Sequence, residues 1–221
     1  MIVVGLTGSI GMGKTTTARM FRRLGIPLYD SDIAVHGMMC QGGEAVACID
    51  RAFPGVVKHG VVNRNVLSSL VFKNPEALLL LESIVHPLVA NQITLFLRNC
   101  QLLRCPIVML DIPLLLETNF HYICDLVVVV SAPNFIQQQR VLARPEITQE
   151  LLVKILSKQI SDYKKRQLSD QIIYTGLGKS YTMRLVKQKL VKIWRNKCKR
   201  KIKNYKRSKC EKLYLIPKQR G

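Results

Sequence analysis

The stretch Gly8-Ser9-Ile10-Gly11-Met12-Gly13-Lys14-Thr15 decides the fold of this 221-residue chain. It is a complete GxxxxGK[ST] motif, and it stands between the apolar segment 2–6 and the helix-forming segment 16–24. A strand, a glycine-rich turn and a helix in this order form the context in which the motif holds a nucleoside triphosphate. The alternative is a glycine-rich turn that binds nothing, and the strand and helix on either side argue against it.

Each residue type in this phosphate loop has a physical task. Small glycines let the backbone wrap so that successive N–H groups point at phosphate oxygens. Lys14 places a compact positive charge on the β- and γ-phosphates, and the Thr15 hydroxyl can ligate Mg²⁺. We expect Lys14 to be a solvated ligand group rather than part of the core. The predicted phosphate-binding residues of the loop are Gly8, Gly11, Met12, Gly13, Lys14, Thr15 and Thr16.

Short aliphatic segments without polar alternation recur along the chain and are predicted to be buried strands. Strands of this kind are typical of a parallel sheet covered by helices on both faces. Helical segments between them favour an open α/β sheet with right-handed crossovers. We therefore predict a P-loop NTPase-type three-layer sandwich with a mainly parallel five-stranded sheet. The predicted strands are 2–6, 26–29, 107–110, 126–130 and 171–174.

The region between the second and third predicted strands contains no convincing strand. Asn63 is predicted to cap a helix through Phe72, and Pro75 to start a longer helix through Arg98. We interpret this region as a substrate-side helical insertion, and a basic helix over 148–167 as a lid. The predicted domains are a kinase domain 1–190 (core 1–32, 104–132 and 168–190; insertion about 33–103; lid about 133–167) and a basic tail 191–221.

The positive charge of the chain is concentrated at its end. The net charge is 34 − 14 = +20, and residues 187–221 contribute 15 − 1 = +14 of it. Such a run can attract nucleic acid or an anionic membrane without specificity, but it is also typical of a solvated helix extension. The tail has too few aromatic residues for a base-stacking surface. We predict no specific nucleic-acid partner and a tail that is dispensable for catalysis.

The remaining composition points to the cytoplasm. The seven cysteines are odd in number and include no CxxC pair, so a disulfide framework or a zinc site is poorly supported. The longest aliphatic runs, such as 78–81 and 127–130, are far shorter than a membrane span of about 20 residues. We predict a cytoplasmic protein without membrane association, and a monomer or weak homo-oligomer.

The segment Asp30-Ser31-Asp32-Ile33-Ala34-Val35-His36 follows the second predicted strand. This is the carboxyl edge, where open α/β sheets bind their ligands. If a helix starts at Ser31, Asp32 and His36 lie one turn apart on one face. Asp32 could then orient or deprotonate an acceptor hydroxyl. The alternative is structural, with Asp30 as the helix cap and Asp32 as an ordinary first-turn acid.

The chain resembles the dephospho-coenzyme A kinases in several motifs that occur in the family's order. The resemblance runs from Ile2 to about Leu190, and such a series is far more specific than the phosphate loop alone. The matching segments are 5–16 (GLTGSIGMGKTT), 30–32 (DSD), 60–64 with Leu67 and 71–72 (GVVNR, VF), 81–87 (LESIVHP), 111–117 (DIPLLLE), and Gln139, Arg140, Arg144, Gln159 and Asp170.

The resemblance implies that the γ-phosphoryl group of ATP is transferred to the ribose 3′-hydroxyl of dephospho-CoA, giving coenzyme A and ADP. It further implies that Asp32 activates this hydroxyl, and that Arg140 and Arg144 reach the transferring phosphates from the lid. Their guanidinium groups can neutralise charge on the equatorial oxygens. For each arginine the alternative is a solvated helix charge.

Other matching residues are given supporting roles. Asp111 ends a buried strand, where a carboxylate commonly reaches Mg²⁺ in P-loop enzymes. His36, His86 and Glu117 are predicted on the substrate side. Glu117 and His86 could instead hold the pocket together by hydrogen bonds, and His86 could equally be a packed core histidine.

The sequence departs from the family pattern in three regions. Ser9 and Met12 replace the usual Gly and Ser at variable positions of the loop, where phosphate binding should survive. Pro145 follows the second lid arginine and restricts the backbone there. Thr175 stands where the family usually has Asn, so it keeps a hydrogen-bonding group but lacks the amide.

Three other functions remain as alternatives. A different small-molecule P-loop kinase is disfavoured by the DSD, HP and DIPLLLE segments. A nucleic-acid-dependent ATPase does not explain why residues 1–186 carry only +6. A degenerate binding protein would not be expected to retain Lys14, Thr15 and Asp32.

Overall fold

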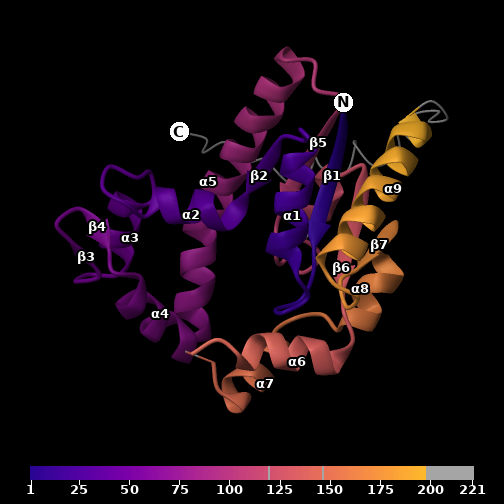
Figure 1. The fold of residues 1–221 in the computed structure, drawn as a ribbon. Coiled ribbons are helices and arrows are strands. Elements are labelled where there is room, and N and C mark those ends of the chain that lie inside the picture. The colour runs from indigo at the N-terminus through magenta and orange to yellow at the C-terminus, as the bar shows by residue number, and fades with distance from the viewer. Residues whose placement is uncertain (119, 146, 198–221) are drawn as a thin grey trace. The chain divides into compact units, whose positions relative to one another are not determined.

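The computed structural model describes residues 1–118, 120–145 and 147–197 (Figure 1). The chain forms two compact units, one of Met1–Leu28 with the residues from Pro106 onward, the other of Tyr29–Cys105. The predicted helical insertion, 33–103, falls inside the second unit. Most of the predicted tail lies outside the described residues.

The central element is a five-stranded sheet with the strand order β2-β5-β1-β6-β7. β1 pairs in parallel with β5 on one side, where Ile2 is opposite Ile107, and with β6 on the other. β6 and β7 are also parallel. The mainly parallel five-stranded sheet that the aliphatic segments predicted is thereby confirmed. Its strands are β1 (Ile2–Thr7), β2 (Leu28–Asp30), β5 (Ile107–Asp111), β6 (Leu126–Ser131) and β7 (Gln171–Tyr174).

One face of this sheet packs on two helices, α1 (Lys14–Arg23) and α9 (Lys179–Lys197). Ile2, Val4 and Leu6 of β1 join buried side chains of both helices in one apolar cluster. The two helices also contact each other, as Figure 1 shows. Burial of this apolar cluster is the main stabilising term for the first unit.

The other face of β1 is covered by the connection between β5 and β6, which includes the 3₁₀ turn η1 (Phe120–Ile123). A Cβ atom at Gly5 would lie 2.5 Å from Leu115 Cδ2 and 2.8 Å from Cys124 Sγ. Only glycine allows this close approach, so Gly5 is required by packing rather than by the phosphate loop.

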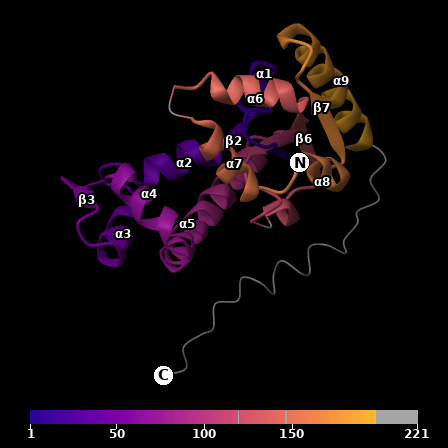
Figure 2. The same cartoon turned by 90° about the horizontal axis from the view of Figure 1, so that it is seen from below.

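The predicted single lid helix over 148–167 is wrong. Two helices replace it, α7 (Gln149–Ser157) and α8 (Asp162–Leu168), and α6 (Asn134–Leu142) precedes them (Figure 2). Thr148 caps α7 as expected, through its hydroxyl and the Leu151 N–H. The break arises because the Ile160 N–H donates to Glu117, and because Ser161 starts a new helix as its cap.

The second unit is mainly helical, as predicted. The Asn63 side chain accepts from Val66 N at the start of α4, and Asn74 accepts from Glu76 N at the start of α5. Both helices run further than predicted, α4 to Lys73 instead of Phe72 and α5 to Leu102 instead of Arg98. The helices are α2 (Ser31–Met38), α3 (Val46–Ala52), α4 (Arg64–Lys73) and α5 (Pro75–Leu102).

The expectation that this region contains no strand is wrong. A short antiparallel hairpin joins β3 (Val57–Lys58) to β4 (Val61–Val62). The turn places His59 at φ 51° and Gly60 at φ 74°, which are the left-handed values of a tight hairpin turn. Strands of two residues give no periodicity, so only the His-Gly turn could have revealed them.

α5 is long and apolar enough to span a membrane by length and composition, which the short aliphatic runs did not indicate. An 18-residue window within Pro75–Leu102 has a mean hydropathy of 1.4, and 11% of it is buried. Length and composition alone are weak evidence for a span, and the absence of membrane association stays a prediction.

α9 continues past the predicted domain boundary at Leu190. It extends to Lys197, and Ile193, only 1% exposed, belongs to the apolar cluster of the sheet. The first turns of the predicted tail are therefore part of the folded unit.

Candidate active site

The phosphate loop turns sharply between β1 and α1. Gly11 and Gly13 adopt φ values of 77° and 90°, a left-handed conformation that glycine reaches without strain. Gly13 stands at the start of α1 and supplies no side-chain cap. The N–H groups of the first helical turn are thus available for an anion, which is the physical basis of phosphate binding at a helix N-terminus.

Lys14 is not the solvated group that we expected. Its Nζ lies 2.7 Å from Asp111 Oδ1, and the two side chains are 13% and 2% exposed. Asp111 ends β5, next to β1 in the sheet, so the parallel register brings this carboxylate to the loop. Thr15 and Thr16, the next residues of α1, are exposed.

Two glutamines hold the tip of the loop. Gln137 of α6 donates from Nε2 to Ile10 O at 2.8 Å, and the Ile10 N–H donates to Gln159 Oε1 at 3.2 Å. A Cβ at Gly11 would lie 2.5 Å from Val141 Cγ2, so α6 packs directly on the loop. Gln137 was not predicted as a site residue, and no short motif contains it.

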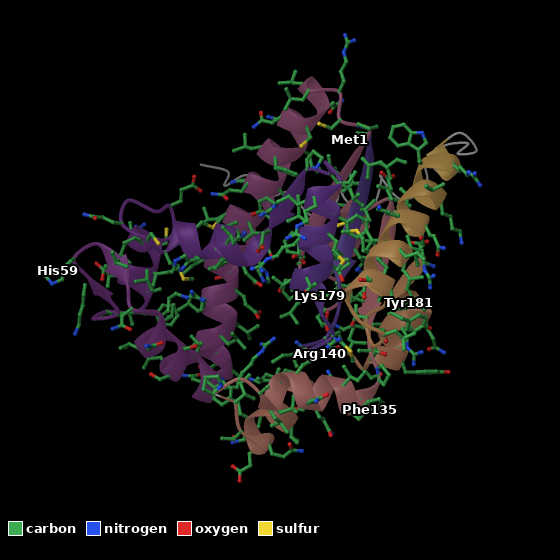
Figure 3. All side chains as sticks on the ribbon, viewed as in Figure 1. Met1, His59, Phe135, Arg140, Lys179 and Tyr181 are labelled. Carbon is green, nitrogen blue, oxygen red and sulfur yellow. The ribbon has the colours of Figure 1, made fainter. Side chains whose placement is uncertain are left out.

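Arg140, in the last turn of α6, extends toward the phosphate loop (Figure 3). Its Nη1 donates to Thr175 Oγ1 at 2.9 Å and to Gly11 O at 3.4 Å, and its Nη2 donates to Thr175 O at 2.7 Å. Arg144, which follows α6, is exposed. The structure thus holds the first predicted arginine at the loop and leaves the second in solvent.

Glu117 connects the β5–β6 segment to the start of α8. It lies 2.8 Å from Lys165 Nζ, whose side chain is 0% exposed, and it accepts from Ile160 N at 3.0 Å. Breaking such a buried pair by removing one partner is strongly destabilising. These contacts favour the supporting role for Glu117, and its predicted contact with substrate stays a prediction.

On the second unit, Asp30 and Asp32 have different environments. Asp30 Oδ1 accepts from the N–H groups of Asp32 and Ile33, so it caps α2. Asp32 is the acid of the first turn and is exposed. The structure thus shows both parts of the structural alternative, Asp30 as the helix cap and Asp32 as an acid of the first turn, and the role of Asp32 at the acceptor hydroxyl stays a prediction.

His36 lies one turn after Asp32 and pairs with Arg64, the first residue of α4. Arg64 Nη1 is 3.1 Å from His36 Nδ1, and Cys40 Sγ is 3.9 Å from His36 Nε2. A guanidinium only donates, so Nδ1 accepts and the imidazole proton is on Nε2. Arg64 belongs to the GVVNR segment, but the sequence assigned it no role.

His86 lies in the middle of α5 and is partly buried, directly before Pro87. Its position on a helix of the second unit agrees with either a substrate-side or a packing role. His59 is part of the hairpin turn, at the far left of Figure 3.

Two buried groups outside the loop resist ionisation. Burial, with a smaller contribution from Asp125, raises the pKa of the Cys124 thiol to about 12. Burial, and then Asp30, likewise raises the pKa of Tyr29 to about 12. Neither group can serve as a base at neutral pH.

The donor set around the loop fits magnesium bound together with a nucleotide. Thr15 offers a hydroxyl and Asp111 a carboxylate, and such hard oxygen ligands suit Mg²⁺. The described residues contain no group of three or more His, Cys, Asp or Glu side chains that could hold a metal alone. Mg²⁺ usually completes its octahedron with phosphate oxygens and water, so this small set is sufficient.

Known proteins are similar to this chain in sequence and in fold. The family model for dephospho-CoA kinase matches residues 2–178. The chain belongs to the dephospho-CoA kinase family. The dephospho-CoA kinase of Paramagnetospirillum magneticum is 53% identical over 166 residues, which cover 75% of this chain and 78% of that protein. The enzyme of Rhodospirillum rubrum is 47% identical over 191 residues, 86% of this chain and 90% of the other.

A solved structure from Thermus thermophilus has the same fold, with a TM-score of 0.74 and 31% identity. The similarity covers 86% of this chain and 97% of that one. Family membership makes the chain a kinase, and the parallel sheet agrees with a P-loop fold. The match to the family model ends at residue 178, directly before α9.

Proposed function

We propose that this chain transfers the γ-phosphoryl group of ATP to the ribose 3′-hydroxyl of dephospho-CoA, giving coenzyme A and ADP in the last step of coenzyme A biosynthesis. The observation that carries the proposal is the complete phosphate loop, with Lys14 paired to the buried Asp111, in a chain that matches the dephospho-CoA kinase family over residues 2–178. We place this reaction in the cytoplasm.

On the ATP side, the loop N–H groups and Lys14 bind the phosphates. Phosphoryl transfer proceeds through a loose transition state, so catalysis depends on positioning and on neutralising charge. Lys14 and Arg140 supply that charge, and Arg144 adds to it from the segment after α6. Thr15 and Asp111 would hold Mg²⁺, which would supply further positive charge to neutralise the transferring phosphates.

On the acceptor side, Asp32 orients the ribose hydroxyl and accepts its proton as the new bond to phosphorus forms. A hydroxyl is a poor nucleophile at neutral pH, and a positioned base contributes a factor of roughly 10² to 10⁴ in rate. His36 and His86 support the substrate, and Glu117 holds the surrounding backbone.

The test is dephospho-CoA-dependent ADP release by the purified chain, measured with a panel of acceptors that includes nucleoside monophosphates and shikimate. Of the acceptors in the panel, we expect only dephospho-CoA to cause ADP release. The product should carry the new phosphate on the ribose 3′-oxygen. Release with another acceptor, or equal release without any acceptor, would contradict the proposal. Lys14→Ala, prepared in parallel, shows that the measured activity depends on the phosphate loop.

A further inference from the structure

Thr175, the residue after β7, connects three segments that are distant in sequence. Its N–H donates to Ser131 O at 2.9 Å, which fixes the residue to the end of β6. Its hydroxyl donates to Met12 O at 2.7 Å and accepts from Arg140 Nη1 at 2.9 Å. The side chain is 5% exposed, so water does not compete for these bonds.

The same residue holds the guanidinium of Arg140 at two points. Nη1 binds the Thr175 hydroxyl, and Nη2 binds the Thr175 carbonyl at 2.7 Å. Two bonds from one planar guanidinium to one residue fix its orientation as well as its position.

The guanidinium held in this way lies beside the backbone that begins α1. A Cβ at Gly13 would be 3.1 Å from Thr175 Oγ1 and 3.4 Å from Arg140 Nη1. This is the turn whose N–H groups are expected to bind phosphate. A side chain here would crowd Thr175 and Arg140, and the φ of 90° also favours glycine.

The charge of Arg140 has no carboxylate partner among the ion pairs of the described residues, which are Lys14–Asp111, Lys165–Glu117 and Arg166–Asp162. Its contacts are with neutral oxygens of Gly11 and Thr175. A guanidinium that is oriented but not neutralised, next to a phosphate loop, is suited to an anionic ligand.

We infer that Thr175 is a positioning residue for ATP: it holds Arg140 over the phosphate loop before the nucleotide arrives, so that little side-chain freedom is lost on binding. The inference rests on the proposed role of Arg140 at the ATP phosphates. Binding is stronger when such a side chain is already ordered. Met12 O, the third partner of Thr175, ties this arrangement to the loop itself.

The experiment is a double-mutant cycle between Thr175→Val and Arg140→Ala, read by the Kd of a non-hydrolysable ATP analogue. Valine keeps the branched shape and removes the hydroxyl. We expect Thr175→Val alone to weaken the analogue about tenfold, as a lost charge-assisted hydrogen bond would. In the Arg140→Ala background the same change should have no further effect.

Two matched variants separate positioning from general structural damage. Thr175→Ser restores the hydroxyl and should return the Kd to within about twofold of wild type, a difference well below one hydrogen bond. Thr182→Val removes another buried hydroxyl, which donates to Gly178 O at 2.8 Å, and should leave the Kd unchanged.

Additive effects of Thr175→Val and Arg140→Ala would overturn the inference, and so would a Thr175→Ser variant as weak as Thr175→Val. If Thr175→Val fails to fold, the inference is still tested by Thr175→Ser and Arg140→Ala. A wild-type Kd in Arg140→Ala would show that Arg140 does not contribute to binding of the analogue, and Thr175 would then have nothing to position. Failure of the proposed function gives a different result, because analogue binding does not require dephospho-CoA. The acceptor panel can therefore refute the proposed function without refuting the inference, and the mutant cycle can refute the inference without refuting the proposed function.

Discussion

The two regions that carry the predicted site residues are built differently. In the first unit, two of the phosphate-side residues are held by other parts of the chain, Lys14 by Asp111 and Arg140 by Thr175 and Gly11. Thr15 and Arg144 of the same unit are exposed. In the second unit, Asp32 and His36 are exposed on a short helix. On the proposed assignment, the phosphates meet the preorganised charges of Lys14 and Arg140, whereas the acceptor meets groups that are exposed to solvent. A change in the first unit should affect both binding and stability, and one in the second mainly turnover.

The largest effect is expected for Lys14→Ala. Loss of this charge should reduce phosphoryl transfer by on the order of 10³ or more, since one preorganised group at the developing charge contributes about that much. It should also lower the free energy of unfolding by about 3–5 kcal/mol, because Asp111 is left buried without its ion-pair partner. Steady-state kinetics and denaturant unfolding measure the two effects.

A matched variant checks the second effect. Adding Asp111→Asn to Lys14→Ala removes the buried negative charge and should recover part of the lost stability without restoring activity. A Lys14→Ala protein as stable as wild type would show that the buried pair contributes little, and the contrast between the units would weaken.

The next effect concerns the two carboxylates of the second unit. Asp32→Asn keeps the size of the side chain but removes the basic site, so kcat should fall roughly 10²- to 10⁴-fold. Asp30→Asn should cost much less, since asparagine also caps helices well. The measurement is kcat at saturating ATP and dephospho-CoA. A larger loss for Asp30→Asn would mean that the roles of the two residues are reversed.

Truncation of the basic C-terminus should give a smaller and position-dependent effect. Removal of the residues after Lys197 should leave kinase activity within about twofold, because that cut removes no side chain from the described core. Removal of those after Leu190 takes away the buried Ile193 and should cost about 2–5 kcal/mol. Thermal unfolding and activity of both proteins distinguish the cuts. Loss of activity in the protein that ends at Lys197 would show that the removed residues take part in catalysis.

The smallest effect is a decrease in the free energy of unfolding at alkaline pH, caused by ionisation of the Cys124 thiol. Its pKa is raised to about 12 in the folded chain, whereas an unfolded thiol ionises near about 8.5. The stabilising contribution is therefore complete below the unfolded pKa and is lost as pH rises toward the folded one. Between about pH 8 and about pH 10, wild type should lose about 1–2 kcal/mol more than Cys124→Ala. If the free energies of unfolding of wild type and Cys124→Ala change equally between these pH values, the raised pKa of the Cys124 thiol is contradicted.

Sequence reasoning succeeded where local chemistry determines structure. The glycines and lysine of the loop, the caps Asn63 and Thr148, and the aliphatic strands all act through a few neighbouring residues. It failed where the local structure depends on a partner that is distant in the sequence. The break between α7 and α8 depends on Glu117, more than 40 residues earlier, and the burial of Lys14 depends on Asp111.

The same limit applies to the site. The phosphate loop and Asp32 were proposed from the residues and their place at the carboxyl edge of the sheet, and family resemblance added Asp111 and Arg140. Thr175 was noticed only as a departure from the family pattern. Its partners Met12 and Arg140 are brought to it by the parallel order of β1, β6 and β7, which local patterns do not encode.

The most direct test of the contrast between the two units is to titrate an ATP analogue into matched Lys14→Ala and Asp32→Asn proteins, with kcat measured on the same preparations. We predict that Lys14→Ala weakens the analogue by at least about tenfold, whereas Asp32→Asn binds it within about twofold of wild type. Asp32→Asn should nevertheless retain less than about a tenth of wild-type kcat. Loss of analogue binding in Asp32→Asn, or retention of more than that fraction of kcat, would contradict the assignment of ATP binding to the first unit and of acceptor activation to Asp32.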